Sequence, residues 1–168
     1  MAYHIAQICL SGHVINDKAD EFPQYNQNFC EICGKTTITT CQHCGSKIRG
    51  QLAVTWMAAD VIQPYSRPAF CAQCGKPYQW TEAAIKAAEE AIELMDELEP
   101  DDKKRFKENI SDIISQTPRT KVAAKLIKRF LDKVAPGTGE LFRQTVINLT
   151  VEGVKQLIWP QLPPSSPQ

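Results

Sequence analysis

The pattern of hydrophobic and polar positions along the chain changes near Trp80. Beyond this residue, apolar side chains recur every three or four positions, which is the spacing of one face of an α-helix. The first eighty residues show no sustained helical period and are rich in glycine, threonine, proline and paired cysteines. We therefore expect a small α+β protein in three parts: a loop-rich domain with short β-hairpins over 1–80, an all-α domain over 81–159 and a flexible proline-rich tail over 160–168.

The second half of the chain contains four segments with helical periodicity. Their apolar positions and turn residues place the helices at about 82–98, 102–115, 119–135 and 140–158. Thr81 is the candidate N-cap of the first helix, and Pro100 is expected to end that helix. In the third helix, Lys121, Lys125 and Lys128 lie opposite an apolar face. Four amphipathic helices can cover one another's apolar faces, which predicts a helical bundle.

The composition is that of an ordinary globular protein, with 43% hydrophobic and 23% charged residues. The longest apolar-leaning stretch, 52–62, is interrupted by Thr55 and Asp60, whereas a membrane-spanning helix needs about 20 apolar residues. The first twenty residues also lack the basic start and apolar core of a secretion signal. These features predict a cytoplasmic protein without a transmembrane segment.

Zero net charge, from 19 basic and 19 acidic side chains, conceals blocks of opposite sign. The net charge is +1 over residues 1–80, −8 over 82–102, +7 over 103–133 and zero over 134–168. Adjacent blocks of opposite sign attract one another, or one of them meets a charged partner. Mutual pairing is the simpler expectation, and the helical half is where an electrostatic partner would act.

All seven cysteines precede residue 75, and six of them form three C-x2-C pairs that are each followed directly by glycine. The seventh, Cys9, has His13 four positions later, so that a histidine can replace the missing thiolate. A C-x2-C-G turn presents two thiolates to one metal ion, and its glycine supplies the positive φ that the turn needs. The candidate ligands are enough for two tetrahedral sites: Cys9, His13, Cys30, Cys33, Cys41, Cys44, Cys71 and Cys74.

The four ligand pairs can combine in two ways. The threonine-rich segment 36–40 favours a strand between Cys33 and Cys41, and a strand rises about 3.3 Å per residue, so its ends lie too far apart to share one ion. Two arrangements satisfy this condition: tandem ribbons, in which consecutive pairs share an ion, and a cross-brace, in which alternate pairs do. We favour the tandem ribbons. Disulfides are disfavoured by the odd number of cysteines and by the expected reducing compartment.

Zinc is the expected metal at both sites, because short-spaced sets of cysteine and histidine are typical of structural zinc. Iron is the alternative at the all-cysteine site, since rubredoxin-like sites also use paired C-x2-C-G turns. His43 lies within a cysteine pair, but its use as a ligand would leave a thiol unused, so we expect a loop residue. His4 has no partner at ligand spacing and is expected at the surface. Coordination by four side chains makes both ions structural rather than catalytic.

The segments around the ligands have a specific sequence: residues 8–16 read ICLSGHVIN, 29–34 FCEICG, 40–45 TCQHCG and 68–81 PAFCAQCGKPYQWT. In these segments the chain resembles an uncharacterised bacterial zinc-ribbon family, a domain of unknown function with paired knuckles and a helical tail. Residues 117–120 and the basic helix after them are similar to that tail, less specifically. Gln79 stands where proline is usual in the family, which affects a loop and no ligand. The resemblance implies the metal sites and a bacterial origin, and it transfers no activity.

The residues predict a non-enzymatic zinc-binding adaptor with two zinc ions, whose helical half contacts a protein partner or further copies of the chain. The sequence contains no Ser-His-Asp grouping, glycine-rich phosphate loop or HExxH motif. Nucleic-acid binding is the main alternative, although a pI of 6.8 disfavours it. Its support is the basic third helix and a set of aromatic residues near the knuckles: Trp56, Tyr65, Phe70, Tyr78 and Trp80.

Two further alternatives concern the helical half and His13. The broad apolar face of the fourth helix is also compatible with self-assembly or with association at a membrane surface, as an accessory or effector subunit. A catalytic zinc would require one site to release a ligand, for instance a loosely bound His13. The pathway and the identity of the partner do not follow from the residues.

Overall fold

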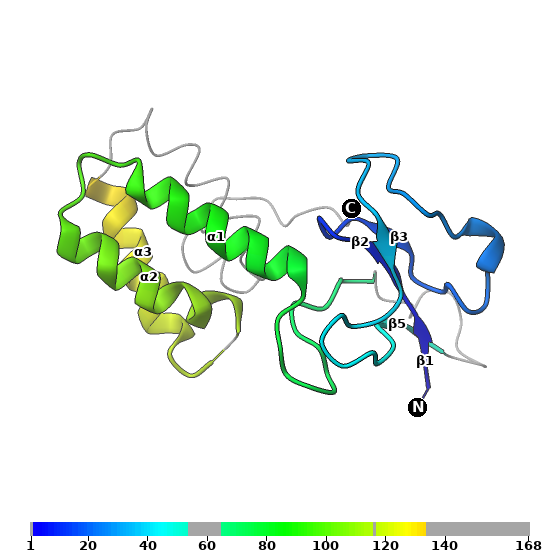
Figure 1. The fold of residues 1–168 in the computed structure, drawn as a ribbon. Coiled ribbons are helices and arrows are strands. Elements are labelled where there is room, and N and C mark those ends of the chain that lie inside the picture. Colours follow the sequence, from blue (N-terminus) through cyan, green and yellow to red (C-terminus); the bar gives the residue numbers. More distant parts are fainter. Residues whose placement is uncertain (1, 54–64, 116, 134–168) are drawn as a thin grey trace. The chain divides into compact units, whose positions relative to one another are not determined.

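The computed structural model describes residues 2–53, 65–115 and 117–133. These residues form two compact units that divide between Glu82 and Ala83. Short strands characterise the first unit and helices the second (Figure 1). The described elements are β1 Tyr3–Ile5, β2 Gln7–Cys9, β3 Val14–Asn16, the 3₁₀ turn η1 Pro23–Tyr25, β4 Thr37–Ile38, β5 Arg49–Leu52, α1 Gln79–Glu93, α2 Pro100–Ile114 and α3 Thr120–Lys133.

The strands of the first unit form two small antiparallel sheets. β1 pairs with β5, and Tyr3 lies opposite Leu52. β2 is the central strand of the other sheet, with β3 and β4 on its two sides, so that Ile8 lies opposite both Val14 and Ile38. β2 and β3 form the expected short hairpin. The small α+β fold predicted from the sequence is therefore confirmed.

A compact apolar core lies within the first unit. The rings of Tyr78 and Trp80 stack with centroids 4.5 Å apart, and Ile38 and Tyr65 pack against the same cluster. A core of this size is small for a domain of about 80 residues, and such domains usually need cross-links as well. Its buried members are Ala6, Ile8, Cys41, Ile48, Cys71, Tyr78 and Trp80.

The three helices of the described region follow the predicted apolar faces. α2 and α3 pack together, and the rings of Phe106 and Phe130 meet edge to face with centroids 6.4 Å apart. Lys133 near the end of α3 forms an ion pair with Asp102 near the start of α2. The helical unit buries a set of apolar side chains at the predicted spacings: Ala88, Ile92, Met95, Leu98, Phe106, Ile110, Ile113, Ile114, Ala123, Ile127 and Phe130.

The bounds predicted for the first helix are wrong at both ends. α1 begins at Gln79, so that Thr81 lies inside the helix, where its hydroxyl donates a 2.8 Å hydrogen bond to the carbonyl oxygen of Ala69 instead of capping. The helix ends at Glu93, although Met95 beyond it stays buried, because a turn continues the apolar spacing. Pro100 is the first residue of α2, a position where its missing N–H has no helical partner to lose.

The predicted fourth helix, 140–158, and the predicted tail, 160–168, lie outside the described residues. Among those described, no helix is both long enough and apolar enough to cross a bilayer.

Candidate metal centres

Eight side chains of the first unit come together in two groups of four. The ligand atoms of each group all lie within 4.8 Å of one another. We name the groups the first centre (Cys9, His13, Cys30 and Cys33) and the second centre (Cys41, Cys44, Cys71 and Cys74). These are the eight residues expected from the sequence. Consecutive pairs combine, as in tandem ribbons, and the cross-braced arrangement does not occur.

The three C-x2-C-G knuckles share one backbone geometry. In each, the N–H of the glycine donates to the carbonyl oxygen of the first cysteine at 2.8–2.9 Å, and the N–H of that cysteine donates to a carbonyl five residues later. The glycines Gly34, Gly45 and Gly75 have φ values of 69°, 71° and 72°. A residue with a Cβ is strained at such positive φ, which explains why glycine follows every knuckle.

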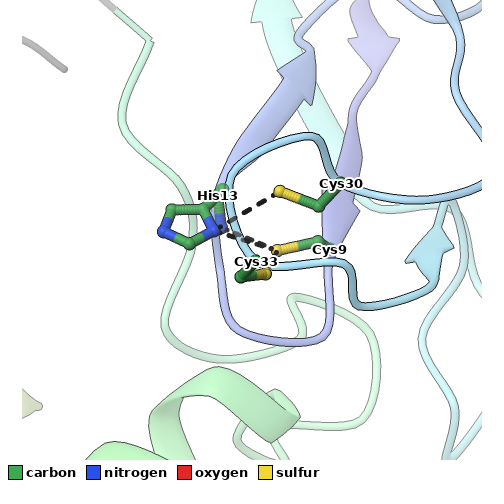
Figure 2. Close-up of side chains that lie close together, drawn as sticks. All are labelled: Cys9, His13, Cys30 and Cys33. Atoms are coloured by element: carbon green, nitrogen blue, oxygen red, sulfur yellow. Dashed lines mark hydrogen bonds between the residues drawn. The ribbon is translucent and has the colours of Figure 1, made fainter.

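The first centre combines one knuckle with the β2–β3 hairpin. Cys9 ends β2 and is fully buried, and Cys30 is 2% exposed. His13 directs its Nδ1 atom at the cysteines, 3.4 Å from Sγ of Cys9 and 3.5 Å from Sγ of Cys30 (Figure 2). The Sγ atoms of Cys9 and Cys33 are 3.7 Å apart.

These spacings fit a tetrahedral metal site. A zinc–sulfur bond of about 2.3 Å gives sulfur–sulfur edges of about 3.8 Å, and an imidazole nitrogen at about 2.0 Å gives slightly shorter edges. A disulfide would instead need about 2.05 Å, and all seven cysteines are free. The four donor atoms of the first centre are therefore already arranged to bind one metal ion through His13 Nδ1.

The second centre is built from two facing knuckles. The sulfurs of Cys41 and Cys74 are 3.9 Å apart, and those of Cys44 and Cys71 are 3.7 Å apart. Both distances match the edges of the same tetrahedron. Cys41 and Cys71, the first cysteine of each knuckle, are 2% and 3% exposed and belong to the apolar core. The second centre is therefore suited to bind one metal ion at the edge of that core.

Ser46 is a polar neighbour of the second centre that the sequence analysis missed. Its Oγ lies 3.1 Å from Sγ of Cys44 and 3.2 Å from Sγ of Cys71. Hydrogen bonding from Ser46, assisted by the backbone N–H of Cys74, lowers the pKa of Cys71 to about 5, which favours the thiolate form that binds metal. A clue was present in the sequence, because the other two knuckle glycines are followed by Lys35 and Lys76 rather than by serine.

The first centre also stabilises a thiolate. The backbone N–H of Lys35 hydrogen bonds to Cys33 and is the main reason why the pKa of Cys33 falls to about 6. Such N–H···S bonds are a property of the knuckle turn and do not depend on a particular side chain.

Arg67 is a second neighbour that the sequence analysis missed. Its Nη1 atom donates a 2.6 Å hydrogen bond to the carbonyl oxygen of Gly12, in the turn between the ligands Cys9 and His13. Gly12 has a φ of 91°, and a Cβ built on it would lie 2.9 Å from both Arg67 Nη1 and Trp80 Cβ. This turn therefore requires glycine for its backbone conformation and for the close approach of its neighbours.

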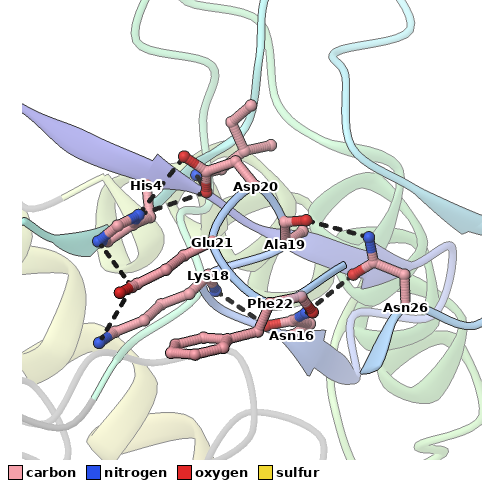
Figure 3. A network of polar contacts seen from close by, with 9 residues as sticks. His4, Asn16, Lys18, Ala19, Asp20, Glu21, Phe22 and Asn26 are labelled. Carbon is pink, nitrogen blue, oxygen red and sulfur yellow. Dashed lines mark hydrogen bonds and ion pairs between the residues drawn. The ribbon is translucent and has the colours of Figure 1, made fainter. Parts of the chain in front are cut away.

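Amide side chains hold the irregular segment that leads to Cys30. Asn16 is 8% exposed, and its Nδ2 donates to the carbonyl oxygen of Phe22 at 2.9 Å and to Oδ1 of Asn26 at 2.8 Å (Figure 3). The amide of Gln7, also 8% exposed, hydrogen bonds to both backbone polar groups of Gln27. These hydrogen bonds fix the segment after β3.

The two histidines outside the centres have acidic neighbours. His4 is half-buried rather than at the surface, with Nδ1 3.4 Å from Asp20 and Nε2 3.3 Å from Glu21 (Figure 3). His43 is an exposed residue 3.8 Å from Glu82, and it is not part of either group of ligands, as expected.

The aromatic residues near the knuckles contribute to packing. Tyr78 and Trp80 are buried, and Nε1 of Trp80 donates a 3.0 Å hydrogen bond to the carbonyl oxygen of Pro68. Tyr65 and Phe70 are half-buried, and Trp56 lies outside the described residues. Tyr78 and Trp80 are therefore not available to stack on bases.

Short antiparallel strands, three knuckles of one backbone geometry and two tandem groups of cysteine and histidine define a zinc-ribbon protein with a helical extension. Residues 2–158 match the family described as "Uncharacterized protein conserved in bacteria (DUF2321)", and the chain belongs to that family. The resemblance to an uncharacterised bacterial family is thereby confirmed. No curated protein and no solved structure matches the chain.

Proposed function

We propose that the protein is a non-enzymatic zinc-binding adaptor, in which two structural zinc ions hold the first unit together and the helical unit contacts a partner. The observation that carries this proposal is that each centre offers four protein donors at tetrahedral spacing. Four donors complete the coordination of zinc and leave no position for water or substrate. A metal held in this way stabilises the fold and presents its surface without taking part in a reaction.

Zinc suits the donor sets of both centres. One imidazole with three thiolates is a common structural zinc set, and the same is true of four thiolates. An iron ion at the second centre is the alternative, since four thiolates on paired knuckles also suit iron. The iron form would be coloured, and the zinc form would not.

Metal analysis beside native mass spectrometry tests the proposal on the full chain. We expect two zinc ions per chain, one for the His13→Ala variant and two again for the His13→Cys variant, because a fourth thiolate can replace the imidazole. A single zinc ion in the unmodified protein, or iron at the second centre, would contradict the assignment.

The same variants test the enzyme alternative. A catalytic zinc at the first centre would need His13 to leave the metal, so His13→Ala would then lose activity while keeping its zinc and its fold. Structural coordination predicts instead that the zinc of the first centre is lost together with the local fold.

Nucleic-acid binding is the second candidate function. Lys35, Lys47 and Lys76 are exposed beside the three knuckles, and Phe29 is 65% exposed next to Cys30. Exposed cations with an aromatic residue suit a single strand. Replacing the three lysines with alanine should then weaken binding to mixed DNA and RNA and reduce its salt dependence. Binding that is absent, or unchanged by salt, removes this candidate.

A further inference from the structure

The helical unit exposes two surfaces of opposite charge. The first is the acidic turn, residues 94–99 between α1 and α2, with exposed carboxylates at Asp96, Glu97 and Glu99. The second is the basic face of α3, with exposed cations at Lys121, Lys125, Lys128 and Arg129. These four cations follow the three- and four-residue spacing that places side chains on one side of a helix. Asp132 is the single acid of α3.

Each surface also holds an exposed aliphatic side chain. Leu94 in the acidic turn is 74% exposed, and Val122 on the basic face is 55% exposed. Within the described part of the helical unit, these two are the large hydrophobic residues that are exposed. Protein interfaces combine apolar and charged side chains, and each of the two surfaces holds both kinds, with charges of opposite sign.

Ion pairs within the described residues leave both surfaces unneutralised. Among the cations of α3, Lys133 alone has a carboxylate partner there, namely Asp102. No basic side chain in the described ranges pairs with Asp96, Glu97 or Glu99. Among the described residues, the mutual pairing expected from the charge blocks therefore neutralises only some of their charged side chains.

The geometry of α2 and α3 limits how much of this pairing one chain can complete. The ion pair of Lys133 with Asp102 lies at one end of the helix pair, and the 3.1 Å ion pair of Arg119 with Asp112 lies at the other, so the helices run antiparallel. The acidic turn precedes α2 directly and thus lies at the Lys133 end. Lys121 is about 18 Å further along α3, beyond the reach of a carboxylate in that turn.

The overall charge favours a protein surface over a nucleic acid as the occupant. Between residues 83 and 133 there are eleven basic and eleven acidic side chains, so the unit is neutral and has two oppositely charged regions. A polyanion drawn to α3 would be repelled by the acidic turn. A second copy of the chain carries the complement of both surfaces.

We propose that the chain self-associates through these two surfaces, with the acidic turn of one copy on the basic face of α3 of another. Val122 and Leu94 lie within the contact, beside the charged side chains. In a two-fold dimer the contact is made twice, and otherwise it links copies into a chain. The inference depends on the proposed function only in taking the helical unit as the contact region.

Sedimentation velocity of the zinc-loaded full chain in about 0.1 M and about 1 M NaCl tests the proposed self-association. Between these salt concentrations the Debye length falls from about 10 Å to about 3 Å. We expect concentration-dependent association that weakens at least about tenfold at high salt. A protein that remains monomeric at every concentration overturns the proposal. Zinc content measured in the same samples keeps the two proposals apart, since a monomer with two zinc ions contradicts self-association alone.

A pair of charge-swap variants makes the test specific to the two surfaces. Asp96→Lys/Glu97→Lys turns the acidic turn basic, and Lys125→Glu/Lys128→Glu turns the basic face acidic. Each variant should lose association by at least about tenfold, because like charges then face each other. Mixed in equal amounts, the two variants should associate again, since every contact between them regains opposite charges.

Lys104→Glu and Glu108→Lys, on the exposed side of α2, are matched controls that should leave association unchanged. Equal losses in these controls would contradict the proposed surfaces, as would failure of the mixture to recover while both variants keep their helical circular dichroism. A third contrary outcome is DNA or RNA binding that Lys125→Glu/Lys128→Glu abolishes, together with no self-association. That result would assign the basic face to a nucleic acid.

Discussion

The two metal centres of the first unit have the same tetrahedral spacing but different surroundings. Cys41 and Cys71 of the second centre are members of the apolar core and share it with the stacked rings of Tyr78 and Trp80. The first centre closes a segment that the amides of Gln7 and Asn16 hold through hydrogen bonds. A metal ion at the second centre would thus be tied directly to the core, whereas at the first it would mainly fix this segment.

The strongest test of this difference removes one cysteine from each centre. Cys71→Ser should lose one zinc ion and unfold the core of the first unit, because structural zinc contributes about 10–16 kcal/mol of apparent free energy in small zinc domains. Cys33→Ser should also lose one zinc ion but keep the core. Zinc content and the near-ultraviolet circular dichroism of Tyr78 and Trp80 measure the two effects. Equal loss of the aromatic signal in both variants would show that the centres are not distinct.

Asn16→Ala tests the polar support of the first centre. The side chain makes three hydrogen bonds, to Phe22, Asn26 and the N–H of Lys18, so its loss should lower the free energy of unfolding by about 3 kcal/mol. Urea denaturation of the zinc-loaded protein measures the change. Asn28→Ala is the matched control, because the Asn28 side chain is exposed and should contribute less than about 0.5 kcal/mol. A similar small effect of Asn16→Ala would contradict the role of the amides.

Gly12→Ala and Gly45→Ala compare the turns of the two centres. Both glycines have positive φ, at 91° and 71°, but of the two only Gly12 has neighbours within 4 Å of the place that a Cβ would occupy. We expect a loss of about 1 kcal/mol for Gly45→Ala from backbone strain, and about 2–3 kcal/mol for Gly12→Ala from strain and crowding. Thermal unfolding at fixed zinc concentration distinguishes the two values. Equal losses would mean that Arg67 and Trp80 move aside without cost.

Ser46→Ala should have the smallest effect, and only at the second centre. Without the hydroxyl the pKa of Cys71, which hydrogen bonding from Ser46 lowers to about 5, should rise, so protons compete better for the thiolate. Because a thiol with a lowered pKa contributes stability that is lost as pH falls, zinc should leave the second centre at a higher pH than in the unmodified protein. An affinity loss of about 10-fold is expected. A zinc-binding titration against pH measures it, and an equal shift at the first centre would be the contrary outcome.

The sequence determined the ligands better than it determined their surroundings. Spacing alone predicted the eight residues that the structure brings together in two groups, and the strand-forming residues 36–40 separated Cys33 from Cys41 correctly. These deductions succeed because a knuckle is a local structure with a fixed spacing. The roles of Ser46 and Arg67 were not predicted, because they depend on tertiary contacts. For Arg67 this contact joins residues 55 positions apart.

The helices were also predicted only in part from the sequence. The buried positions of α2, apart from Asn109, follow the apolar periodicity that predicted a helix there. The end of α1 was predicted wrongly, because Met95 and Leu98 continue the apolar spacing although the helix has already ended at Glu93. Hydrophobic periodicity reports which side chains are buried, and it reports the backbone conformation only as long as the two agree.

The tandem order of the ligands has a consequence for how the protein is made. Every ligand of the first centre lies before every ligand of the second along the chain, which would not hold for a cross-brace. A ribosome therefore releases all four residues of the first centre once Cys33 has left its exit tunnel, before Cys71 and Cys74 of the second centre have emerged. Loops closed within such short stretches form quickly, so metal loading can proceed from the N-terminus onwards during translation. In this order, the apolar core of the first unit is completed after its first centre, when Cys71 and Trp80 emerge.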